Sequence, residues 1–186
     1  MTKLIHGRNR LINRAITFAT NAHNDQVRKG NSFIPYIFHP IDVANEVIYY
    51  SGLPEELIQL ASTVAILHDV VEDTSVGADE LQVEFGAEIT QAVLFLTKDD
   101  TVEQSNQLNE NLGRLELAPA FVQCVKLADR VSNLKVFPAM WNKARIGKYL
   151  DDSAVIAQCL GGASETLNAR LLMRVAENRM KLSLYN

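Results

Sequence analysis

The sequence predicts an all-α fold, a single compact helical domain that spans residues 1–186. Apolar residues recur at spacings of three and four along most segments, which is the period of an amphipathic helix. No segment shows the strict alternation of a strand, and no internal repeat is present. A chain of 186 residues with 47% hydrophobic residues can bury one sizeable core. The apolar stripes are wide and short, which favours a packed helical domain over a coiled coil.

Three helices are predicted in the first part of the chain. An apolar stripe over residues 11–22 indicates the first helix. A second helix follows a loop punctuated by prolines, and it stops at Gly52. Pro54 suits the first turn of the third helix, because its missing N–H costs nothing there. This third helix is expected to continue through the motif AILHDVVEDT at residues 65–74.

The later helices are separated by clearer breaks. They are predicted over residues 79–96, 118–137, 151–160 and 163–182. The first of these segments is broken near Gly86, and the polar stretch 97–113 predicts a connection with at most one weak helix. Pro138 is expected to end the next helix, and Ser164 is a plausible N-cap for the last one.

The composition excludes several classes of protein. Eighteen Lys and Arg residues against 22 Asp and Glu residues give a formal net charge of −4, so the whole molecule offers no electrostatic footprint for nucleic acid. No segment reaches the roughly 18 apolar residues of a membrane span, and none resembles a signal peptide, so the cytoplasm is the default location. Cys124 and Cys159 lack C-x-x-C spacing and are expected to be reduced core residues. No feature of the sequence specifies an oligomeric state.

The motif AILHDVVEDT places four ionisable groups at the end of an apolar run. Positions four apart share a face of a helix, so His68 lies in line with Glu72, and Asp69 with Asp73. Four such groups beside a buried stripe would desolvate or repel one another unless a cation lay between them. We therefore expect a metal ion at this motif.

Two distant residues strengthen the prediction of a metal site. His39 precedes a helix-opening proline, and Asp129 lies among apolar residues in KLADRVSN. With His68 and Asp69 they form a nitrogen and oxygen ligand set, which suits manganese, iron or magnesium with positions left for water. A closed structural zinc site would more often use cysteine. Each residue alone is more often an ordinary polar group, but the ordered pattern H…HD…D rarely arises by chance.

This ordered pattern resembles the HD superfamily of metal-dependent phosphohydrolases. The blocks AHNDQVRKG, PYIFHPIDVA, AILHDVVEDT, EFGAEITQAVLFLTK and VKLADRVSNL are similar to the RelA/SpoT-type hydrolase domain, which removes the 3′-pyrophosphate of the alarmone ppGpp. The resemblance covers residues 15–134, and the C-terminal helices at about residues 150–183 complete one HD-type domain. No segment resembles the synthetase or regulatory domains of the long enzymes. The chain therefore resembles the small stand-alone alarmone hydrolases, which include the metazoan SpoT homologs.

The resemblance implies a role for each residue that matches a motif. The implied ligands of a manganese ion are His39, His68, Asp69 and Asp129. The carboxylates implied to lie beside the attacking water are those of Glu72 and Asp73. The residues implied to meet the nucleotide are Arg28, Lys29 and Asn133, and Lys126 and Arg130 are further candidates to meet phosphate charge. A solvated turn is an equal alternative for the Arg-Lys pair, and His23 is expected to be structural.

The predicted activity is hydrolysis of ppGpp or pppGpp, a small-molecule nucleotide, with release of pyrophosphate. Two positions depart from the family pattern, because Gly30 and Ser132 stand where the long enzymes commonly have Ser and His. Both positions are expected near the bound nucleotide, so they bear on which base of the substrate the enzyme prefers. One alternative is an HD phosphatase for another nucleotide, either a ppApp-type alarmone or the 2′-phosphate of NADPH. Another is a non-catalytic nucleotide-sensing module, although a structural ion would have no use for Glu72 and Asp73.

Overall fold

Helices make up the regular secondary structure of the described part of the chain. The computed structural model describes residues 2–28 and 33–184, and in this part the prediction of an all-α fold is confirmed. A single antiparallel bridge joins Val27 to Pro35. The helices are α1 (Thr2–Ala22), α2 (Phe38–Tyr50), α3 (Glu55–Leu67), α4 (Val70–Asp73), α5 (Ala78–Phe85), α6 (Ala87–Leu96), α7 (Gln107–Glu116), α8 (Ala120–Asn133), α9 (Lys143–Leu160), the short 3₁₀ helix η1 (Gly161–Ala163) and α10 (Glu165–Leu184).

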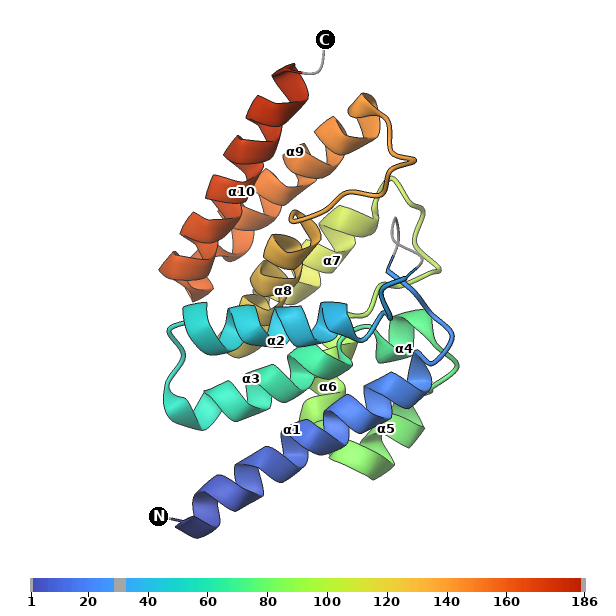
Figure 1. Ribbon diagram of the computed structural model, residues 1–186, viewed down its shortest axis with the longest axis vertical. Coiled ribbons are helices and arrows are strands. Elements are labelled where there is room, and N and C mark those ends of the chain that lie inside the picture. The colour runs from blue at the N-terminus through green and yellow to red at the C-terminus, as the bar shows by residue number, and fades with distance from the viewer. Residues whose placement is uncertain (1, 29–32, 185–186) are drawn as a thin grey trace.

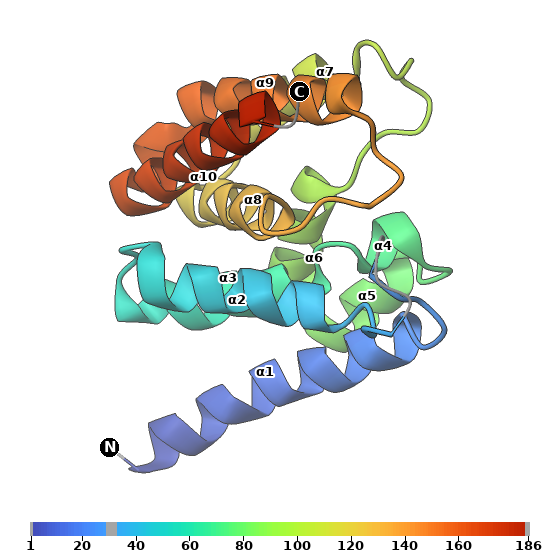
Figure 2. The ribbon, with the colours of Figure 1, turned by 45° about the horizontal axis from the view of Figure 1, so that its top comes forward.

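Three helices from distant parts of the sequence form the centre of the molecule. Helices α2, α3 and α8 pack against one another, and α1 covers the outer side of α3. Helices α9 and α10 form an antiparallel pair that packs on α8 from the other side (Figures 1 and 2). None of the helices in the described ranges is long and apolar enough to cross a membrane.

Fully buried apolar side chains pack in the centre of α2, α3 and α8. Val43 and Val47 on α2, Val64 on α3 and Leu127 and Val131 on α8 have no exposed surface. Each such side chain contributes about 1.5–3 kcal/mol through burial. Helices α2 and α8 carry His39 and Asp129 of the predicted metal site, and His68 and Asp69 directly follow α3, so core packing determines where these polar groups meet.

The prediction of one continuous helix through residues 65–74 is wrong. Helix α3 ends at Leu67, α4 begins at Val70, and His68 and Asp69 occupy the turn between them. The His68 Nδ1 atom donates a hydrogen bond to the Ala65 carbonyl at 2.7 Å and so satisfies an acceptor at the end of α3. Val70 is fully buried, so this turn keeps an apolar side chain in the core while the polar side chains on either side of it face the site.

Other boundaries near the site differ from the predictions. Helix α8 ends at Asn133 rather than near Pro138, and residues 134–142 form a loop. Helix α9 begins at Lys143, eight residues before the predicted start, because the Asn142 side chain accepts a hydrogen bond from the Arg145 backbone N–H and caps it.

The predicted break at Gly86 and the predicted N-cap of the last helix are confirmed. Gly86 adopts a φ of 84° between α5 and α6. Ser164 accepts a hydrogen bond from the Leu167 N–H at 3.2 Å. Of the two cysteines expected in the core, Cys124 is buried, but Cys159 is exposed, so that prediction is wrong for Cys159.

Candidate metal centre

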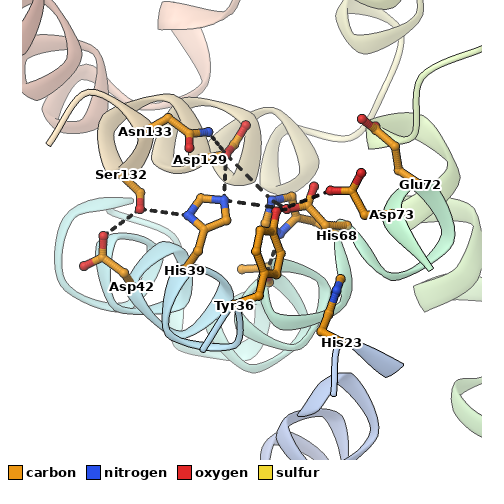
Figure 3. Close-up of polar contacts among 12 residues, drawn as sticks. His23, Tyr36, His39, Asp42, His68, Glu72, Asp73, Asp129, Ser132 and Asn133 are labelled. Atoms are coloured by element: carbon orange, nitrogen blue, oxygen red, sulfur yellow. Dashed lines mark hydrogen bonds and ion pairs between the residues drawn. The ribbon is translucent and has the colours of Figure 1, made fainter. Parts of the chain in front are cut away.

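Two buried histidines direct the same ring nitrogen toward a common space. His39 lies in the first turn of α2 and His68 follows α3, with their ring centroids 5.3 Å apart (Figure 3). The His68 Nδ1 atom must carry a proton, because its partner is the carbonyl of Ala65. The His39 Nδ1 atom lies 3.1 Å from the Ser132 hydroxyl, which itself donates to a carboxylate and so accepts from the ring. In the neutral form of both rings the lone pair is therefore on Nε2.

Two aspartates complete this cluster. His68 Nε2 lies 3.1 Å from Asp69 Oδ2 and 3.7 Å from Asp129 Oδ1. His39 Nε2 lies 3.3 Å from Asp129 Oδ1 and 3.6 Å from Asp69 Oδ2. The structure therefore brings together all four residues that the sequence predicts as metal ligands.

The chemistry of the cluster fits a divalent ion. Ligand atoms of His39, His68 and Asp129 lie within 4.8 Å of one another, and all three residues are buried. The His68 Nε2 atom is buried without a hydrogen-bond partner among the described residues. Neighbouring ligands of an octahedral ion at about 2.1 Å lie about 3 Å apart, which is close to the separations measured here. An ion bound by these atoms would satisfy the buried nitrogen and offset the two carboxylate charges.

The charges in the cluster perturb its pKa values strongly. Burial disfavours the charged form of His68, but the Asp69 and Asp129 carboxylates outweigh burial and raise its pKa to about 10. Burial also opposes ionisation of Asp129, yet Lys126 and the two imidazoles hold the pKa of this carboxyl well below its usual range. In the metal-free site, a proton on His68 Nε2 therefore supplies the positive charge that a metal ion would otherwise provide.

We expect metal binding to release about one proton per chain at neutral pH. Below its raised pKa His68 carries a proton on Nε2, and an ion must displace that proton, so affinity falls about tenfold for each unit by which the pH is lowered. Manganese titrations by calorimetry between pH 6 and pH 8, in two buffers with different ionisation enthalpies, measure both quantities. Affinity that is independent of pH, with no proton release, would contradict the protonated state of the metal-free site.

Tyr36 links the metal cluster to Asp73. Its hydroxyl donates to Asp69 Oδ2 at 2.5 Å and lies 3.4 Å from Asp73 Oδ2. Burial and the charge of Asp69 raise the pKa of Tyr36 far above its usual range, so the hydroxyl stays protonated and acts as a donor. The ring packs against His23, with centroids 4.7 Å apart. Our sequence-based predictions did not include Tyr36, although it belongs to the block PYIFHP.

The two predicted catalytic carboxylates lie differently in the structure. Asp73 points toward the Tyr36 hydroxyl, whereas Glu72 stands apart from the drawn network (Figure 3). Glu72 accepts a hydrogen bond from the Lys98 backbone N–H at 3.0 Å and forms an ion pair with the Lys98 ammonium. No local pattern in the sequence predicted the role of Lys98, because it lies 26 residues further along the chain.

The side chains of the cluster line a pocket of about 260 Å³. Glu72 and Asp73 line the same pocket. Its basic lining residues are Arg28, Lys98, Lys126 and Arg130, and its aromatic ones are Tyr36, Phe137, Trp141 and Tyr149. Cations and flat apolar rings beside a metal cluster suit a ligand that combines phosphate groups with a base.

The predicted nucleotide-binding residues contact the cluster or line this pocket. Arg28 donates to Asn133 Oδ1 at 3.0 Å, and Asn133 donates to Asp129 Oδ1 at 2.5 Å. The Lys126 ammonium lies 3.2 Å from Asp129 Oδ2. The guanidinium of Arg130 lies 4.2 Å from the centroid of the Tyr149 ring, and its Nε and Nη1 atoms are buried without hydrogen-bond partners among the described residues. Lys29 and Gly30 lie outside the described residues.

A helical core that joins two histidines and two aspartates in a pocket with basic lining residues fits a metal-dependent hydrolase. Comparison with protein families identifies the family of the chain. The chain belongs to the HD domain family, whose model matches residues 15–149.

Known relatives match almost the whole chain. The chain is 30% identical to the guanosine-3′,5′-bis(diphosphate) 3′-pyrophosphohydrolase MESH1 of Mus musculus over 172 residues, which cover 90% of this chain and 94% of that protein. It is 31% identical to MESH1 of Homo sapiens over 161 residues, which cover 84% and 88% of the two chains. A solved structure of a metazoan ortholog of SpoT that hydrolyses ppGpp superposes with a TM-score of 0.81 over 90% of this chain and 95% of that one. At 23% identity, this last likeness concerns the fold.

Proposed function

We propose that the chain is a manganese-dependent 3′-pyrophosphohydrolase that converts ppGpp to GDP and pyrophosphate. The observation that carries the proposal is the cluster of buried His39, His68 and Asp129 with the partly buried Asp69, in a pocket that four basic residues also line. Relatives named for this activity match the chain over most of both lengths, which supports the choice of substrate.

The four clustered side chains would hold the ion. Nitrogen and oxygen donors without sulfur favour manganese, magnesium or iron over structural zinc, and we propose Mn²⁺. When bound, such an ion lowers the pKa of a water molecule and neutralises charge on a phosphoryl oxygen.

We propose that Asp73 and Glu72 orient the attacking water and move its protons. Asp73 lies near the cluster, because Tyr36 bridges it to Asp69. The water oxygen bonds to the phosphorus that is attached to the ribose 3′ oxygen, and the bond between that phosphorus and the 3′ oxygen breaks. A proton then passes to the 3′ oxygen. General acid–base catalysis of this kind typically contributes about 10²–10⁴-fold to a rate.

The remaining charge of the substrate would meet the basic residues of the pocket. Arg130 offers donors that have no hydrogen-bond partner among the described residues, and Lys126 lies beside Asp129. Arg28 and Asn133 pair with each other at the edge of the cluster, where we propose that they contact the ribose and its phosphates. Lys29 is proposed for the same pocket from the sequence alone.

The products of ppGpp test this proposal directly. Protein loaded with manganese should release GDP and pyrophosphate from ppGpp and should leave GDP intact, because only the 3′ arm is held at the cluster and positioning supplies about 7–11 kcal/mol of barrier reduction. Chromatography of reactions with ppGpp, pppGpp, ppApp and NADPH measures each product, and chelator-treated protein is the control.

The other outcomes of this assay identify the alternatives. Release of orthophosphate, or faster cleavage of NADPH or ppApp than of ppGpp, would assign the chain to the HD phosphatases for other nucleotides. Binding of manganese and nucleotide without any turnover would indicate a nucleotide-sensing module.

A further inference from the structure

The Nδ1 atom of His39 begins a chain of hydrogen bonds that leads away from the cluster to a partly exposed carboxylate. His39 Nδ1 lies 3.1 Å from the Ser132 hydroxyl, and this hydroxyl donates to Asp42 Oδ2 at 2.6 Å. His39 and Ser132 are each only 3% exposed. The Ser132 hydroxyl lies between the His39 imidazole and the Asp42 carboxylate (Figure 3).

Ion pairs anchor the far end of this chain. The Lys135 ammonium lies 2.7 and 2.8 Å from the two oxygens of Asp42 and 2.8 Å from Glu46 Oε1. Arg170 on α10 holds both oxygens of Glu46, at 2.9 and 3.1 Å. Asp42 of α2 is therefore tied to Lys135 in the segment that follows α8. The ammonium keeps it as a carboxylate, which can only accept hydrogen bonds.

The direction of the Ser132 hydroxyl decides which His39 tautomer is favoured. On its other side the ring faces Asp129 and Asp69, at 3.3 and 3.6 Å from Nε2, and both carboxylates would stabilise a proton on Nε2. A proton there occupies the lone pair that a metal ion needs. A serine alone could donate to Nδ1 and permit this unproductive tautomer, because a hydroxyl both donates and accepts. Asp42 takes the hydroxyl proton, so Ser132 presents a lone pair to His39 and favours Nδ1–H.

We infer that Ser132 and Asp42 are positioning residues, which together hold His39 with its Nε2 lone pair toward the metal cluster. The inference rests on the proposed metal site and adds two residues to it. Ser132 stands where the long RelA/SpoT-type enzymes commonly have histidine. Its short hydroxyl reaches His39, and Asp42 sets the direction of that hydroxyl. Partners of this kind, one step beyond a metal ligand, are typically worth about 10- to 100-fold in metal affinity.

Manganese affinity, measured by calorimetry, tests each hydrogen bond from His39 through Ser132 to Asp42. Ser132→Ala and Asp42→Asn should each raise the Kd about 10- to 100-fold. Ser132→Thr keeps the hydroxyl and should stay within about threefold of the parent. Ser62→Ala is the matched control, since it removes a fully buried hydroxyl that donates to the Ile58 carbonyl of its own helix. A parental Kd in folded Ser132→Ala, or an equal loss in Ser62→Ala, would overturn the inference.

A double variant shows whether Asp42 acts on His39 through Ser132 or independently of it. Because Asp42 acts through Ser132, Asp42→Asn should change the Kd little further once Ser132→Ala is present. Additive losses would show that Asp42 does not act through the hydroxyl. If Ser132→Ala does not fold, Asp42→Asn carries the comparison with the parent, since that carboxylate is 36% exposed and its replacement removes no core atom.

The tautomer itself can be measured without metal. Long-range ¹H–¹⁵N correlation spectra of metal-free protein, with His39 assigned from the signals lost in His39→Gln, should show Nδ1–H in the parent and a shift toward Nε2–H in Ser132→Ala and Asp42→Asn. The same tautomer in all three proteins would overturn the inference. A parent that binds no manganese would instead refute the proposed metal site, and the spectra would still decide what Ser132 and Asp42 do.

Discussion

Asp129→Ala is expected to abolish manganese binding and, with it, hydrolysis. Its Oδ1 atom lies 3.3 and 3.7 Å from the Nε2 atoms of His39 and His68, and the residue is only 6% exposed. Removing it deletes both a ligand and a negative charge that favours a cation in the pocket. Since even indirect partners of a metal are worth about 10- to 100-fold in affinity, the loss here should exceed about 100-fold. Asp69→Ala should behave in the same way, because Asp69 Oδ2 faces the same two nitrogens.

Elemental analysis of protein purified without chelator, together with calorimetry, measures this loss. Asp152→Ala is a suitable control, because Asp152 pairs with Lys148 on the surface of α9. Thermal unfolding of the metal-free proteins would show whether the loss of metal comes from a loss of fold. Parental manganese content in either cluster variant would show that the ligand assignment is wrong.

The fold was predictable where apolar periodicity and glycine breaks decide it. Val43 and Val47 on α2, Val64 on α3 and Val131 on α8 are buried as their spacing predicts, although Ile48 of the predicted α2 stripe is exposed. Gly86 separates α5 from α6. The errors arose where side chains act on the backbone. The Asn142 cap starts α9 before any clear apolar stripe, and the bond from His68 to Ala65 accompanies the end of α3 inside an apolar run. Such bonds depend on side-chain direction, which periodicity does not contain.

The candidate site was predictable as a set of residues but not as a network. The order of His39, His68, Asp69 and Asp129 along the chain was enough to expect one cluster, and core packing of three helices brings them together. Tyr36, Lys98 and Asp42 were missed, because each has its role through a partner far away in the sequence. The sequence also predicted Glu72 in line with His68 and Asp73 in line with Asp69 on one helix, whereas the helix ends before His68, and Glu72 and Asp73 contact different partners.

Asp73→Asn is expected to have the second large effect, because Asp73 faces the Tyr36 hydroxyl whereas Glu72 pairs with Lys98. Asparagine keeps the size of the side chain and an oxygen near Tyr36 but is a poor proton acceptor at neutral pH. Asp73 does not belong to the buried cluster, so the manganese Kd should remain within about threefold of the parent, while kcat falls about 10²–10⁴-fold. Glu72→Gln should also retain manganese and lose most turnover. Here the weakened pair with Lys98 should change the KM for ppGpp as well, because Lys98 lines the pocket.

Calorimetry for manganese, run beside steady-state kinetics over a range of pH, separates catalysis from metal binding. If Asp73 accepts the proton of the attacking water, Asp73→Asn should remove the acidic limb of the kcat profile, which a loss of packing alone would leave in place. Asp79→Asn is the matched control, since Asp79 is an exposed carboxylate in the first turn of the next helix, α5. Parental rates in both Asp73→Asn and Glu72→Gln would remove these carboxylates from the mechanism. A weakened Kd with an unchanged kcat at saturating manganese would instead assign Asp73 to the support of the metal site through Tyr36 and Asp69.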